Sequence, residues 1–198
     1  MSNEMLLAMT SFAFAMACTP GPNNIMLTAS GVNFGFARSA AHMAGVVIGF
    51  VVLLGACAAG LGLIITAWPG IHTGLKIVGG AYLLWLAWKV ANAGQPKKAE
   101  DAGGKPLTFL QAAAFQWVNP KGVLTSLSAV SLFVRPGSAS FDVPVMLAVF
   151  AVATLVAVTV WTAFGTAVGR LLRDPGHARI FNIAMALLLV ASIVPMVM

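Results

Sequence analysis

Charged residues are scarce in this chain. Asp, Glu, Lys and Arg together make up 8% of its 198 residues, whereas a soluble domain usually carries about 25%. Hydrophobic residues make up 60%. Because so few charges cannot cover a water-facing surface, a soluble globular domain is excluded. The composition predicts one integral membrane domain over residues 1–198, embedded in a lipid bilayer.

The chain also lacks the motifs of common membrane enzymes. Lys105 follows two glycines, but Pro106 comes next and the spacing of a phosphate-binding loop is missing. The chain has no H-E-x-x-H motif, no G-x-S-x-G motif and no pair of carboxylates within an apolar segment. Its three histidines and two cysteines do not follow a metal-ligand spacing. We therefore expect no enzymatic activity, no cofactor and no metal.

The few remaining reactive side chains have ordinary interpretations. Cys18 and Cys57 lie in apolar stretches and are expected to be buried, with no disulfide framework. Asp142 precedes an apolar segment and is expected to cap a helix. His42 and His72 lie near the starts of apolar segments, so we expect both to face loops.

Apolar segments long enough to span a bilayer occur six times. They lie near residues 5–29, 40–67, 71–91, 107–134, 143–168 and 179–198, and a span needs about 20 residues. A polar linker at 93–106 separates a first repeat, about 1–92, from a second, about 107–198. Three helices per half is an odd number, so the second half enters the membrane from the opposite side. The predicted fold is all-α, with six transmembrane helices in two inverted three-helix repeats.

Basic residues predict the orientation. They gather in the loops after the first, third and fifth segments, at Arg38, Lys89, Lys97, Lys98, Lys105, Arg170, Arg173 and Arg179. Such loops are cytoplasmic by the positive-inside rule, which places both termini outside. The net charge of +6 does not indicate nucleic-acid binding, because the basic residues form no stripe interleaved with aromatic residues.

Glycine pairs at helical spacing indicate where helices approach closely. Gly45 and Gly49 form one pair, and Gly165 and Gly169 form another. We interpret both as ordinary packing contacts.

Proline interrupts the first and fourth segments. Pro20–Asn24 lies inside the first, and Asn119–Gly122 lies inside the fourth. Proline removes a backbone donor and breaks a helix, which lipid tolerates only where a cavity or protein satisfies the freed groups. Two broken helices at corresponding positions indicate a transporter binding site. The candidate substrate-path residues are Pro20, Gly21, Pro22, Asn23, Asn24, Thr28, Asn119, Pro120, Lys121, Ser126 and Ser128.

These residue types suit a zwitterion. A half-helix starting near Asn23 presents its positive end to a carboxylate, and the freed carbonyls suit an ammonium group. Lys121 is costly within an apolar segment and can hold a carboxylate. The alternatives are a proline kink that only shapes the bundle and a lysine that reaches toward the lipid headgroups.

Four stretches resemble the LysE/RhtB superfamily of bacterial amino-acid exporters. They are Thr19–Asn24, Gly79–Lys89, Gln116–Lys121 and Asn182–Leu189, and the likeness runs almost from end to end. The branch that exports cysteine and O-acetylserine looks most similar, beside the homoserine and threonine exporters. The resemblance implies a six-helix inner-membrane carrier driven by the proton gradient, with both proline motifs lining the transport path.

The predicted function is secondary export of a small neutral amino acid or derivative, with the proton as coupling ion. The sequence leaves open which residue carries the proton and whether the chain forms a homo-oligomer. Two alternatives are an uncoupled channel or facilitator for a small polar solute, and a membrane assembly protein that transports nothing.

Overall fold

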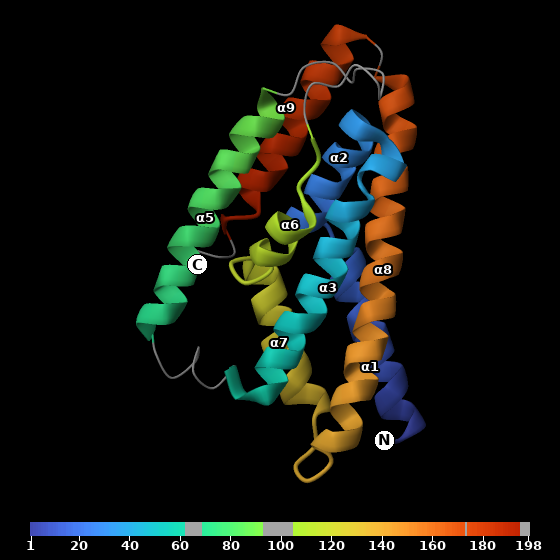
Figure 1. Cartoon of the computed structure of the whole chain (residues 1–198), viewed down its shortest axis with the longest axis vertical. Coiled ribbons are helices and arrows are strands. Elements are labelled where there is room, and N and C mark those ends of the chain that lie inside the picture. The colour runs from blue at the N-terminus through green and yellow to red at the C-terminus, as the bar shows by residue number, and fades with distance from the viewer. Residues whose placement is uncertain (62–68, 93–104, 173, 195–198) are drawn as a thin grey trace.

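The computed structural model describes residues 1–61, 69–92, 105–172 and 174–194. Helices dominate this part of the chain, which contains no β-strand (Figure 1). The elements are α1 (Asn3–Cys18), α2 (Pro22–Arg38), α3 (Ala40–Ala56), the π-helical turn η1 (Cys57–Leu61), α5 (Pro69–Ala91), α6 (Phe109–Phe115), α7 (Pro120–Phe133), α8 (Ala139–Leu171) and α9 (Pro175–Ala191). The linker predicted at 93–106 lies almost entirely outside the described residues.

Several helices are long and apolar enough to cross a bilayer. Within the described ranges, Ala40–Gly60 and Ala139–Gly169 pass this test singly, and α1 with α2 passes it as a pair bent by 53°. Ile77–Ala91 and Gly176–Ala191 are shorter apolar helices. The described helices are therefore consistent with a membrane protein.

The outer faces of the bundle are apolar as well. Large hydrophobic side chains are exposed along α5, α8 and α9, as at Ile77, Leu84, Leu155 and Leu187. In water, such contiguous apolar surface would favour aggregation. These faces therefore suit the acyl chains of lipid.

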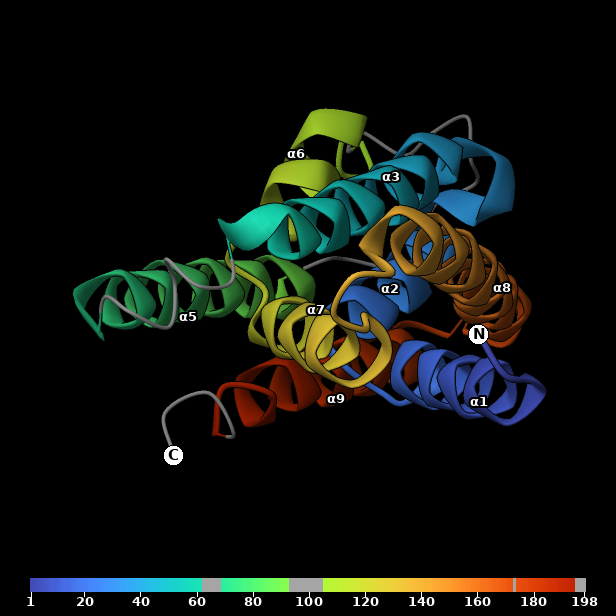
Figure 2. The same ribbon diagram turned by 90° about the horizontal axis from the view of Figure 1, so that it is seen from below.

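Helices α2 and α7 lie near the centre of the bundle. Seen from below, α2 and α7 are surrounded by α3, α8, α1, α9 and α5 (Figure 2). The long helix α8 contacts both α1 and α2, whereas α3 contacts α6 and α5 contacts α9. Helix α3 therefore packs against the helices on either side of Pro120, and α8 packs against the helices on either side of Pro20.

The glycine pairs lie at these helix contacts, which confirms the packing interpretation. A Cβ atom on Gly45 would collide with the Phe109 carbonyl oxygen, and one on Gly165 would collide with the Thr28 carbonyl oxygen. Neither position has room for any side chain. Glycine thus lets α3 approach α6, and lets α8 approach α2.

Three expectations for single residues were wrong. Asp142 does not cap its helix. Its carboxylate accepts hydrogen bonds from the Arg135 backbone N–H (3.1 Å), Nε (2.9 Å) and Nη2 (2.8 Å). These bonds close the turn between α7 and α8.

His42 does not face a loop but is completely buried. Cys57 is buried as expected, but Cys18 is exposed because α1 ends there. The side chain of His72 lies outside the described residues.

Candidate functional site

The first segment is interrupted between Cys18 and Pro22. Pro22 occupies the first turn of α2, where its missing N–H costs nothing. The last carbonyl groups of α1 therefore lose their helical partners. Side chains replace these partners: Asn24 Nδ2 donates to the carbonyl oxygens of Ala17 (2.8 Å) and Thr19 (2.9 Å).

Lys121 also reaches this interruption. Its Nζ donates to the Thr19 carbonyl oxygen at 2.5 Å, although the two residues are 102 positions apart. The ammonium group thus lies at the negative end of α1, which is a favourable place for a cation. Gly21 leaves space for the lysine stem, since a Cβ atom there would lie 2.8 Å from Lys121 Cδ. One bond to Thr19 leaves two N–H donors of the ammonium group for another partner.

The second interruption separates α6 from α7. Gln116 follows the last residue of α6, and Asn119 precedes Pro120, the first residue of α7. The Asn119 side chain makes no capping hydrogen bond, and its buried Oδ1 has no partner among the described residues. A buried acceptor without a donor is rare. This oxygen is therefore available to a donor such as an ammonium group.

An amide pair connects the two interruptions. Asn23 Nδ2 donates to Gln116 Oε1 at 2.8 Å, and Gln116 Nε2 donates back to Asn23 Oδ1 at 3.2 Å. Gln116 Nε2 also donates to the Ala112 carbonyl oxygen at 2.8 Å, which fixes the side chain against α6. The residue after each proline, Asn23 or Lys121, therefore reaches the interruption in the opposite half.

A cavity of about 520 Å³, which includes its open part, lies where these groups meet. Its polar end is formed by the two interruptions, and its apolar walls come from α1, α3 and α8. Six of the predicted path residues line it: Gly21, Pro22, Asn23, Asn24, Asn119 and Lys121.

The other five predicted residues lie outside the cavity lining. Pro20 and Ser128 are exposed, and Pro120 is half-buried in the first turn of α7. Thr28 is buried between α2 and α8, where its hydroxyl donates to the Asn24 carbonyl oxygen at 2.8 Å. Ser126 is buried, and its hydroxyl has no partner among the described residues.

Sequence reasoning missed several residues at the cavity. Thr125 lies one helical turn after Lys121, so helical spacing is a signal that places it on the same face. Gln116 does not line the cavity but pairs with Asn23, which does; it is a polar residue three positions before Asn119 in an apolar segment, which is also a visible signal. Phe50, Phe150 and Thr154 line the cavity only because of how α3 and α8 pack, and the sequence carries no local sign of it.

The lining contains little that could perform chemistry. No group of three or more His, Cys, Asp or Glu side chains that could hold a metal ion occurs among the described residues. The polar groups at the cavity are one ammonium group, side-chain amides, hydroxyls and backbone carbonyls. Such a set can bind both ends of a zwitterion but offers no activated nucleophile.

Apolar helices around an internal polar cavity are typical of helical membrane transport proteins. Residues 14–193 match the family described as LysE type translocator. The chain is 35% identical over 195 residues to cysteine/O-acetylserine efflux proteins of Escherichia coli (strain K12), Escherichia coli O9:H4 (strain HS) and Shigella sonnei (strain Ss046), with 96% of this chain and 96% of each relative covered. No solved structure matches the chain. This protein belongs to the LysE type translocator family.

The amide pair gives a first testable prediction. We expect Asn23→Ala and Gln116→Ala each to lower the melting temperature and transport rate, because each leaves the partner amide partly unpaired in a buried place. The double variant should lose less than the sum of the two single losses. Thermal unfolding of the purified variants in detergent measures this coupling.

The control is Asn92→Ala, which removes an exposed amide that donates to the Trp88 carbonyl oxygen at 2.8 Å. It should leave transport unchanged. Strictly additive losses for Asn23→Ala and Gln116→Ala would show that the two side chains do not interact.

Proposed function

We propose that this protein is a secondary exporter of small neutral amino acids or their derivatives, with cysteine and O-acetylserine as the first candidates. The observation that carries the proposal is the juxtaposition of the Lys121 ammonium group, the unpaired Asn119 Oδ1 and the interruption at Thr19 around one cavity. The names of the relatives at 35% identity support the choice of substrate.

The substrate's charged ends have complementary partners. Its carboxylate accepts hydrogen bonds from the two remaining N–H groups of Lys121, as charge-assisted bonds. Its ammonium group donates to Asn119 Oδ1. A small side chain then lies against the apolar walls near Phe50 and Phe150.

We propose that the chain is one transporter domain of two inverted repeats, about 1–92 and 107–198. Two observations support this arrangement. The second helix of each half, α3 or α8, packs against the interrupted helix of the other half. Asn23 and Lys121, each the residue after a proline, reach across to the opposite interruption. Rocking of the halves about the cavity gives alternating access.

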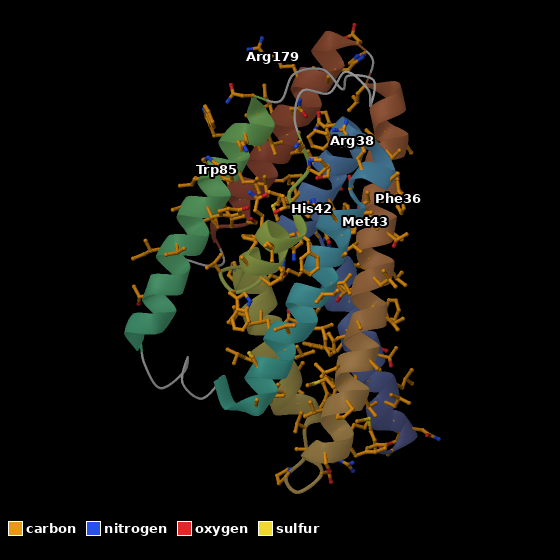
Figure 3. The ribbon with its side chains drawn as sticks, viewed as in Figure 1. Phe36, Arg38, His42, Met43, Trp85 and Arg179 are labelled. Carbon is orange, nitrogen blue, oxygen red and sulfur yellow. The ribbon has the colours of Figure 1, made fainter. Side chains whose placement is uncertain are left out.

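We propose that the protein lies in the bacterial inner membrane with both termini outside. Arg38 and Arg179 lie at one end of the bundle (Figure 3), and the N-terminus lies at the other end (Figure 1). The positive-inside rule assigns the end with Arg38 and Arg179 to the cytoplasm. Export against a gradient then requires an energy source, and we propose the proton gradient.

An efflux assay tests the proposed function. Proteoliposomes loaded with radiolabelled cysteine, O-acetylserine, homoserine, threonine, lysine or leucine should release the small neutral compounds faster than protein-free vesicles. An inward proton gradient should accelerate the release, which an uncoupled facilitator does not predict. If the protein accelerated the loss of none of these compounds, the exporter assignment would be wrong.

A further inference from the structure

His42 is a buried ionisable residue that the substrate site does not use. Its side chain is completely buried near the start of α3. Its Nδ1 lies 2.9 Å from the Ser30 hydroxyl on α2, and its Nε2 has no hydrogen-bond partner among the described residues. An unpaired buried nitrogen is costly, so its presence calls for an explanation.

The position of this pair relates it to the cavity. Val46 and Phe50, one and two helical turns after His42, line the cavity from α3. Asn23, two turns before Ser30, lines it from α2. Val46 and Val158 of the cavity lining belong to the apolar cluster that also contains Leu27. His42 lies farther than Arg38 from the end of the bundle that carries Arg179 (Figure 3).

Other ionisable groups on the elements packed against α3 are few. These elements carry Arg38 on α2, Lys121 on α7, Asp142 and Arg170 on α8 and Cys57 in η1, and α6 carries none. Arg38 lies beside the Phe34 ring, Lys121 holds Thr19, and Asp142 holds Arg135. Histidine is also the residue whose ordinary pKa suits proton exchange near neutral pH.

We propose that His42 is the proton-binding residue that couples export to the proton gradient, with Ser30 as its positioning residue. This inference rests on the proposed exporter function. A proton from outside binds the lone pair of a ring nitrogen, and both nitrogens of the imidazolium then act as donors. The Ser30 hydroxyl must then accept from Nδ1–H. The proton leaves to the cytoplasm after the amino acid has been released outside.

Separating exchange from coupled efflux tests the role of His42. At equal pH, exchange of internal radiolabelled cysteine for external unlabelled cysteine needs no net proton movement. Accumulation of cysteine outside the vesicles against its gradient, driven by a pH difference, does need it. For the wild-type protein and one proton per substrate, each pH unit sustains about tenfold accumulation. We expect His42→Gln to retain exchange and to lose the accumulation. The control His177→Gln changes an exposed histidine and should behave as wild type.

The outcomes are distinguishable. Wild-type exchange without any response to a pH difference would overturn the coupling proposal and leave a facilitator. Absence of wild-type exchange with every amino acid would overturn the exporter function itself. His42→Gln that still accumulates cysteine would overturn the role of His42. Should this variant not fold, Ser30→Ala decides: a displaced pH midpoint of coupled efflux supports the proposal, and an unchanged midpoint refutes it.

Discussion

Replacing Lys121 by Met should greatly slow efflux while the protein still folds. The substitution removes the ammonium group at the Thr19 carbonyl oxygen and leaves a side chain of similar length. A hydrogen bond to a charged group contributes about 1.5–3 kcal/mol, so substrate binding should weaken by about ten- to hundredfold. Folding should persist because removing a charge from the membrane interior also removes an energetic cost. Initial efflux rates and the melting temperature in detergent measure the two effects.

Lys89→Met is the matched control. Lys89 lies near the end of α5, with its Nζ 4.4 Å from the centre of the Trp85 ring, and is not part of the cavity lining. It should retain wild-type efflux. If Lys121→Met transported as well as Lys89→Met, Lys121 would not bind substrate. The alternative of a lysine that reaches toward the lipid headgroups would then be favoured.

The polar end of the cavity is predictable from the sequence because proline acts locally. Pro22 and Pro120 each begin a helix, and their neighbours Asn23 and Lys121 lie at the cavity. Proline geometry depends on the adjacent backbone alone, so no knowledge of the packing is needed. The predicted segment at 107–134 lies close to the observed limits of α6 and α7 for a similar reason, since apolar runs end where polar residues begin.

The hydroxyl residues are less predictable because packing decides which helix face turns inward. Thr28 and Ser126 are predicted path residues, yet both are buried outside the cavity lining. Ser128 shares the exposed face of α7 with Leu124 and Leu132. The place of His42 in the sequence predicts a loop-facing side chain, yet α3 begins at Ala40 and carries it into the bundle.

Gly165→Ala should cause the largest loss of stability of the substitutions considered. The added Cβ atom would collide with the Thr28 carbonyl oxygen, and the reciprocal contact is equally close, because a Cβ atom on Gly31 would collide with the Thr162 carbonyl oxygen. Both obstacles are backbone atoms, so no side chain can rotate away and the helices must separate. Overpacking of this kind costs about 1–3 kcal/mol. The melting temperature in detergent should fall clearly below that of the wild type.

Gly74→Ala provides the control, since a Cβ atom there would meet nothing within 4 Å. Alanine in an exposed helix should stabilise the protein by about 0.5–1 kcal/mol. Efflux should fall in Gly165→Ala but not in Gly74→Ala. Helix α2 carries Asn23 and Asn24 to the cavity, and it shifts when α8 is pushed away. Equal melting temperatures for Gly165→Ala and Gly74→Ala would mean that α2 and α8 are not in contact at Thr28. The cavity could then not lie between α2 and α8.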